Sequence, residues 1–69
     1  MPIVHVNILE GRSEEKRNRM ARRVSEAIAE TLDAPIESIR VLVHEVSSDD
    51  WYVGGKSKAE RDHDNDSQT

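Results

Sequence analysis

The chain has 69 residues, no cysteine and a formal net charge of −4, with 35% of its residues charged. A chain this short forms one domain that buries only about 60% of its unfolded surface, and the lack of cysteine excludes disulfides and thiolate metal sites as reinforcement, so we expect its subunits to associate. The acidic balance argues against nucleic acid or an acidic membrane as a partner, and the lack of a span of about 20 apolar residues or of a signal peptide indicates a cytoplasmic protein.

The first predicted element is a β-strand over residues 3–9. Apolar and polar side chains alternate there, with Val4, Val6 and Ile8 on one side and His5 and Asn7 on the other. This is the period of a strand with one apolar face. Gly11 then permits a turn that a side chain would resist, so the strand ends before it.

Pro2 stands directly before this strand. If Met1 is removed, Pro2 carries a free secondary amine, and an α-amino group titrates near ~7.7 to 8.0. Burial and neighbouring cations lower the pKa of an amine further, because both disfavour its charged form. A terminal Pro2 is therefore a candidate base near neutral pH, whereas an ordinary Met-Pro start would carry no chemistry.

An amphipathic helix is predicted from Ser13 to Asp33. Ser13 is the expected N-cap, acidic residues follow in the first turn, where the helix dipole favours them, and Pro35 stops the helix. The expected buried stripe, spaced by three and four residues, comprises Met20, Ala21, Val24, Ala27, Ile28 and Leu32. The cations of the helix are Lys16, Arg17, Arg19, Arg22 and Arg23. Since glutamates flank them in an acidic chain, we interpret them as a solvated or subunit-contacting face and not as a nucleic-acid site.

A second strand is predicted over residues 39–46, after a short turn at residues 36–38. A strand, a covering helix and another strand form a β-α-β unit with two parallel strands, and a parallel sheet needs both faces covered. One helix covers one face only, so a second copy of the chain is expected to cover the other. His5 and His44 lie on the two strands and could share a metal, but two histidines without a third ligand favour ordinary exposed or hydrogen-bonded side chains. We therefore expect no metal site.

The rest of the chain is predicted to hold a polar loop at residues 47–50 and a short hairpin over residues 51–55. The hairpin carries the only aromatic residues, Trp51 and Tyr52, beside a glycine pair. Trp51 is either a packing anchor between subunits, as aromatic residues often are, or the wall of a pocket. We expect residues 1–55 to form the α/β domain. Residues 56–69, with a single aliphatic side chain, are expected to form a polar, mobile tail that cannot order itself.

Three residues could carry chemistry in a chain without a nucleophile and base pair or a phosphate loop. Arg12 lies where the first strand meets the helix, a position that faces ligands in α/β units, and Arg40 opens the second strand, where a buried guanidinium would need a partner. Arginine binds carboxylates bidentately, although either arginine alone is more often a member of a surface ion pair. An anionic substrate held by these groups would meet Pro2 as the base, while a cation stabilises the oxygen anion that forms when a proton leaves carbon.

Several runs over about residues 2–56 carry a resemblance to a known family. They are Pro2-Ile3, Ile8-Leu-Glu-Gly-Arg-Ser13, Val24-Ser-Glu-Ala-Ile28, Leu32-Asp-Ala-Pro35, Arg40-Val41 and Gly54-Gly55. They closely resemble 4-oxalocrotonate tautomerase, also called 2-hydroxymuconate tautomerase. The resemblance implies a β-α-β subunit, usually six to an assembly, that uses no cofactor and moves a proton between oxygen and carbon of an unsaturated dicarboxylate through its amino-terminal proline.

The resemblance also implies roles for particular residues. Pro2 and Arg40 become the candidate catalytic residues, and the candidate substrate-binding residues are Arg12, Leu9, Trp51 and Val53. In the family, the arginine at the position of Arg12 binds one carboxylate of the substrate. The arginine at the position of Arg40 binds the end of the substrate that carries the carboxylate and the carbonyl near the reacting enol. Trp51 stands where we expect the family's phenylalanine, and Tyr52 replaces a glycine, which changes the wall of the pocket and leaves the proton chemistry intact.

The expected activity is the conversion of 2-hydroxymuconate, or a similar dienol dicarboxylate from the degradation of aromatic compounds, to its 2-oxo form by a homo-oligomer, expected to be a hexamer. Two alternatives stay open. A dehalogenase or hydratase of the same superfamily would need a carboxylate near the pocket to activate water. Val53 occupies the position where that glutamate would be expected, but Asp49 and Asp50 are close enough in sequence to keep this alternative open. A non-catalytic assembly subunit would keep the fold for packing with a different chain.

Overall fold

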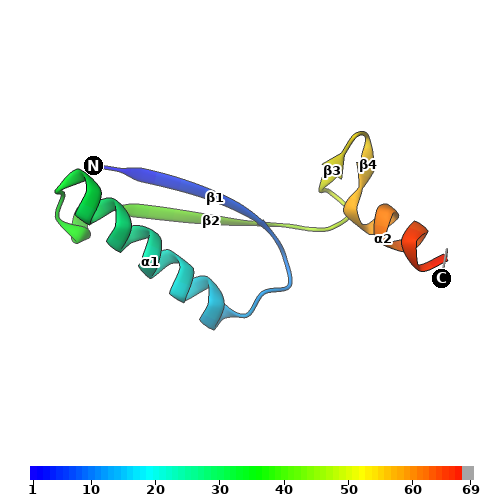
Figure 1. Ribbon diagram of the computed structural model, residues 1–69, viewed down its shortest axis with the longest axis horizontal. Helices are drawn as coiled ribbons and strands as arrows, with labels where there is room; N and C mark the ends of the chain where they lie inside the picture. Colours follow the sequence, from blue (N-terminus) through cyan, green and yellow to red (C-terminus); the bar gives the residue numbers. More distant parts are fainter. Residues whose placement is uncertain (68–69) are drawn as a thin grey trace.

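The computed structural model describes residues 1–67, with side chains as far as His63 (Figure 1). A β-α-β unit is followed by a small hairpin and a second helix. In chain order the elements are β1 (Ile3–Leu9), α1 (Glu14–Leu32), the 3-10 helix η1 (Ile36–Ser38), β2 (Arg40–Val46), β3 (Tyr52–Val53), β4 (Lys56–Ser57) and α2 (Lys58–Ser67). The α/β class, the long helix and the hairpin are confirmed.

The two long strands pair in parallel, as predicted. The register runs from Ile3 opposite Arg40 to Leu9 opposite Val46, and the ladder continues because the amide of Glu10 donates to the carbonyl oxygen of Val46 over 2.9 Å. Helix α1 covers one face of this sheet (Figure 1). Because side chains alternate along a strand, the helix-facing set is Val4, Val6, Ile8, Val41, Val43 and Glu45.

The other side of the sheet has no cover within the described chain, and we call it the open face. Its side chains are Ile3, His5, Asn7, Leu9, Arg40, Leu42, His44 and Val46. Ile3 and Leu42 are 59% and 41% exposed although both are large and apolar. Because a parallel sheet normally has both faces covered, the open face is the surface that a further subunit is expected to meet.

The ends of α1 lie where the sequence predicts them. The hydroxyl of Ser13 accepts a hydrogen bond from the amide of Lys16 over 3.2 Å, and Asp33 ends the helix in the left-handed conformation, with φ of 55°. The predicted buried stripe is only partly right, because Ala27 and Leu32 are exposed in the single chain. A sheet of two strands, about 4.8 Å apart, is too narrow to cover every apolar side chain of a 19-residue helix.

Residues 47–67 form an arm that extends away from the β-α-β unit (Figure 1). Its strands β3 and β4 pair antiparallel, which confirms the predicted hairpin. Gly54 and Gly55 make the turn with φ of 62° and 86°, the positive values that a tight two-residue hairpin turn requires. The hairpin continues to Ser57, so the expected domain boundary at residue 55 falls inside it.

The expectation that the tail does not order itself is wrong as far as residue 67, because α2 begins at Lys58. The hydroxyl of Ser57 accepts a hydrogen bond from the amide of Glu60 over 3.1 Å, and Lys58 pairs with Asp62 one turn later. Local capping and pairing across one helical turn stabilise the start of this helix. The mobility of the segment stays a prediction, and residues 68–69 lie outside the described residues.

The chain alone is elongated and nearly without a core. It measures 50 × 24 × 16 Å with a radius of gyration of 16.2 Å, whereas a compact chain of this length has about 11 Å. Ile39 is the single buried apolar residue among those described. The accessible surface is 5433 Å², roughly 1,000 Å² more than the size rule for compact monomers gives. Neither helix of the described chain is long and apolar enough to cross a bilayer.

Candidate active site

Pro2 and Arg40 lie together at the start of the sheet. The backbone amide of Arg40 donates to the carbonyl oxygen of Pro2 over 2.9 Å, so the residue that precedes β1 is fixed beside the first residue of β2. The Arg40 side chain is exposed and not buried, and its Nη1 donates to the carbonyl oxygen of Glu37 over 2.8 Å. A guanidinium has five N–H donors, so most of them remain available to an anion. Met1, which precedes Pro2, is 84% exposed.

Leu9 and Arg12 lie at the opposite end of β1. After the strand, Gly11 turns the chain with φ of 119°. Arg12 follows it, and its Nη1 donates to the carbonyl oxygen of Leu9 over 3.1 Å. The guanidinium therefore rests, exposed, at the edge where the strand meets α1, which is the ligand-facing edge expected of an α/β unit.

Trp51 and Val53 lie on the arm. Trp51 is half-buried, its carbonyl oxygen accepts a hydrogen bond from the amide of Lys58 over 2.7 Å, and Val53 is 52% exposed. Both residues therefore belong to the arm, and Val53 leaves about half of its surface exposed. Asp49 and Asp50, the carboxylates considered for water activation, are exposed in the turn that precedes them.

The single chain does not bring these three pairs of residues together. Seven residue steps separate Pro2 from Leu9 along β1, which corresponds to about 23 Å at about 3.3 Å per residue. The N-terminus lies at one end of the sheet, and the arm extends beyond the other end (Figure 1). A six-carbon diacid is far shorter than this separation, so no such substrate can reach Pro2, Arg12 and Trp51 of one chain at the same time.

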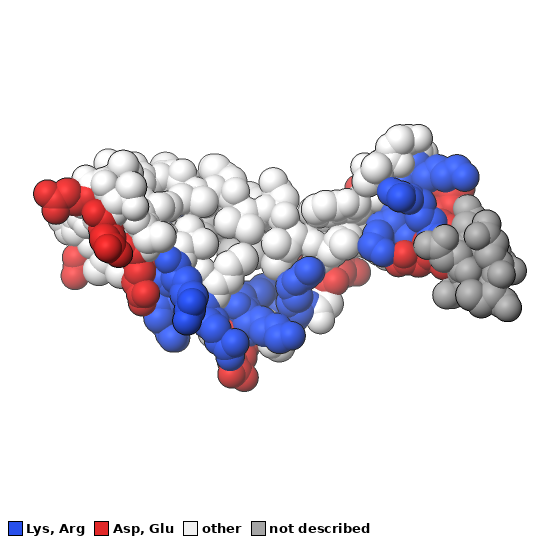
Figure 2. All heavy atoms as spheres, in the orientation of Figure 1, with Lys and Arg blue, Asp and Glu red and all other residues white. Residues whose placement is uncertain are grey.

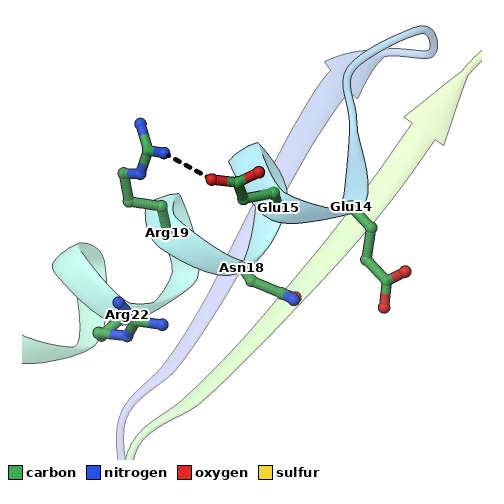
Figure 3. A pocket seen from close by; sticks show the side chains of 5 residues that line it. All are labelled: Glu14, Glu15, Asn18, Arg19 and Arg22. Atoms are coloured by element: carbon green, nitrogen blue, oxygen red, sulfur yellow. Dashed lines mark hydrogen bonds and ion pairs between the residues drawn. The ribbon is translucent and has the colours of Figure 1, made fainter.

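A surface groove of about 540 Å³ lies elsewhere, on the outer side of α1 (Figure 3). Its lining residues are Glu14, Glu15, Asn18, Arg19 and Arg22. All five come from one helix, and the Nη2 of Arg19 pairs with Glu15 over 3.2 Å. The groove contains none of the predicted site residues and is a hollow between solvated side chains.

Basic side chains gather over α1, on the lower side of the β-α-β unit in the view of Figure 2. Four of them are exposed, namely Lys16, Arg19, Arg22 and Arg23. The solvated face that the sequence predicts is therefore present. Arg17 differs, because it is only partly exposed and has defined partners.

Arg17 and Glu45 are two residues that the sequence reasoning did not single out. The Nη1 of Arg17 lies 2.7 Å from a carboxylate oxygen of Glu45 and donates to the carbonyl oxygen of Arg12 over 2.7 Å. In the sequence, Glu45 could have indicated this ion pair, because a single acidic residue on the helix-facing side of an apolar strand needs a partner.

His5 and His44 are neighbours on the open face. Their rings are stacked, with centroids 5.8 Å apart and an interplanar angle of 5°, and both side chains are exposed. Within the described part of the chain, no group of three or more histidine or acidic side chains could hold a metal ion.

The chain is a small α/β subunit, a β-α-β unit with a proline before its first strand and an arginine paired with that proline through the backbone. The chain belongs to the tautomerase family: the family model described as "Tautomerase enzyme" matches residues 2–61. The 2-hydroxymuconate tautomerase of Stutzerimonas stutzeri is 47% identical over 57 residues, which cover 83% of this chain and 90% of that protein.

Solved structures agree with the fold. TomN, a 4-oxalocrotonate tautomerase homologue of the tomaymycin biosynthetic pathway, is 40% identical and superposes with a TM-score of 0.88 over 90% of this chain and 95% of its own. The heterohexamer 4-oxalocrotonate tautomerase from Chloroflexus aurantiacus is 40% identical, with a TM-score of 0.83 over 87% of this chain and 97% of that chain. Tautomerases of this fold therefore include oligomeric assemblies.

Proposed function

We propose that the chain is a cofactor-free isomerase that converts 2-hydroxymuconate, or a similar dienol dicarboxylate, to its 2-oxo form. The observation that carries this proposal is the pairing of Pro2 with Arg40 at the start of the sheet. This backbone bond fixes Pro2, the residue before β1, beside the first residue of β2, and we propose that the Arg40 guanidinium acts beside the secondary amine that Pro2 carries once Met1 is removed. The membership of the tautomerase family supports the same chemistry.

In the proposed reaction, the amine of Pro2 takes the proton from the enol hydroxyl of the substrate. The oxygen electrons form the carbonyl double bond, the carbon–carbon double bond shifts, and the proton returns from the prolyl ammonium to carbon. Arg40 stabilises the negative charge on oxygen during the transfer. No oxidant, reductant or metal is required, because only one proton moves and the electrons stay within the substrate.

The proposed site needs more than one subunit. Arg12, which would bind the distant carboxylate, contacts Leu9, and Leu9 lies about 23 Å from Pro2 along β1, so Arg12 would serve the Pro2 of a neighbouring subunit. An antiparallel arrangement of two copies would place the Leu9 and Arg12 end of one beside the Pro2 end of the other. The excess surface of roughly 1,000 Å² is comparable to the ≈ 800 Å² that each partner buries in a standard interface. We propose a homo-oligomer, and a hexamer as its final state.

The arm would complete the pocket from another copy. Trp51 and Val53 lie on the arm that extends away from the β-α-β unit (Figure 1), and Tyr52 and Val53 are 64% and 52% exposed. A neighbouring subunit that covers them would place Trp51 as one wall of the site. The larger indole, in place of the phenylalanine expected from the family resemblance, is predicted to restrict the size of the substrate. A cytoplasmic location and a role in the degradation of aromatic compounds belong to the same proposal.

A second candidate is a non-catalytic assembly subunit, favoured by the heterohexamer among the structural relatives. The purified single chain separates the two functions. Protein whose intact mass proves that Met1 is absent is expected to ketonise 2-hydroxymuconate, and the loss of dienol absorbance measures the rate. Protein that retains Met1 is expected to be nearly inactive. Equal rates for the two forms would exclude the amine of Pro2 as the base, and an inactive processed chain would favour the assembly subunit.

A further inference from the structure

A cation of α1 holds the loop that carries Arg12. One terminal nitrogen of Arg17 makes two contacts of 2.7 Å, one to the carbonyl oxygen of Arg12 and one to a carboxylate oxygen of Glu45. The contacts therefore connect helix α1, the loop between β1 and α1, and strand β2. The side chains of Arg17 and Glu45 are 31% and 36% exposed, so water screens the pair less than a fully exposed one.

Besides the Arg17 contact, the loop between β1 and α1 is held at its two ends and by the Arg12 side chain, whose Nη1 donates to the carbonyl oxygen of Leu9 over 3.1 Å. The amide of Glu10 joins the carbonyl oxygen of Val46 at the end of the sheet, and Ser13 caps α1. Between them, Gly11 has φ of 119° and no side chain to pack. The Arg17 contact holds the carbonyl oxygen of Arg12 and so holds the backbone from which the Arg12 side chain leaves the loop.

Arg17 differs from the other cations of the helix. Arg19, two residues further along α1, pairs with Glu15 over 3.2 Å, with side chains 58% and 83% exposed. That pair joins two residues of the same helix and reaches no other element. Such exposed pairs across one helical turn contribute little to the stability of the fold. Arg17, in contrast, connects three elements at the edge where Arg12 lies.

We propose that Arg17 is a positioning residue for substrate binding, and that Glu45 orients Arg17. Arg17 fixes the peptide of Arg12, so that the Arg12 guanidinium meets the distant carboxylate of a diacid in a defined direction. The inference rests on the proposed function, because it assigns Arg17 to the same substrate site. Arg17 itself does not touch the substrate, so its loss weakens binding of the second carboxylate and leaves the proton transfer at Pro2 unchanged.

The first test compares two substrates. With 2-hydroxymuconate, Arg17→Met is expected to raise KM about tenfold and to leave kcat within about twofold, because binding at a remote charged group is lost. With 2-hydroxypenta-2,4-dienoate, which lacks the distant carboxylate, KM is expected to stay within about twofold of the unchanged enzyme. Arg17→Lys, which can reach one or both oxygens, is expected to recover a large part of the affinity. The matched control, Arg19→Met, is expected to change neither KM.

A similar rise in KM for both substrates, or no rise for the diacid, would overturn the proposal. The second test does not depend on activity: amide hydrogen exchange at residues 11–13 is expected to accelerate in Arg17→Met and in Glu45→Met, and to stay unchanged in Arg19→Met. Unchanged exchange in the first two variants refutes the positioning role. If the loop loosens as expected but the unmodified protein ketonises neither substrate, the positioning of Arg12 stands and the proposed function fails.

Discussion

Removing the two large apolar side chains of the open face is expected to weaken assembly. Ile3 and Leu42 are 59% and 41% exposed in the single chain, and together they present about as much apolar surface as one fully exposed side chain. Complete burial of such a side chain contributes about 1.5–3 kcal/mol. Because each of two subunits contributes a pair, the double variant Ile3→Ala/Leu42→Ala should lose about 3–6 kcal/mol, a weakening of the dissociation constant of roughly 10²- to 10⁴-fold.

Sedimentation velocity over a concentration series measures this effect directly. The double variant is expected to dissociate at concentrations where the unchanged protein remains assembled. Leu32→Ala is the matched control, because Leu32 is 61% exposed but lies at the end of α1, away from the open face. An unchanged assembly in the double variant, or an equal loss in the control, would show that the open face is not the principal interface.

Three further predictions concern catalysis and the arm. Arg40→Ala is expected to lower kcat as well as kcat/KM, since its contact strengthens as charge builds on oxygen, whereas Arg12→Ala should raise mainly KM; identical profiles would contradict the division of roles. Arg40 is expected to lower the pKa of the Pro2 amine, so kcat/KM should be constant at high pH and fall as acid protonates the amine. The midpoint of the fall should lie below the ordinary α-amino pKa of ~7.7 to 8.0. A midpoint at or above this range would refute the effect. Deleting residues 58–69 should leave the circular dichroism of the β-α-β unit largely unchanged, apart from the loss of α2, and a general loss of structure would show that the arm supports the unit.

The elements of the β-α-β unit could be predicted because their signals are local. The alternation of Val4, Val6 and Ile8 defines β1, and the Ser13 cap defines the start of α1. The second helix escaped prediction because composition was read only as a lack of apolar side chains. The Ser57 cap and the spacing of Lys58 and Asp62 are also local signals, and they stabilise the start of this helix.

The residues of the candidate site can be named from the sequence, and the length of β1 also predicts their separation. A strand of seven residues between Pro2 and Arg12 already implies about 23 Å. Arg17 could not be distinguished from its neighbours by charge, because its role depends on which side of α1 faces β2. Glu45 supplied the only hint, as a lone acid among the apolar side chains of that face.

This separation leads to a test that needs no knowledge of the interface. If each site combines Pro2 of one subunit with Arg12 of another, two defective variants should complement each other. Protein that retains Met1 has no free amine but an intact Arg12, and processed Arg12→Ala has the reverse. After the two are unfolded and refolded together in equal amounts, random pairing in a symmetric assembly should restore about one quarter of the sites. The kcat/KM of the mixture should then exceed the mean of the two separate preparations, whereas a site built within one chain would give that mean and no more.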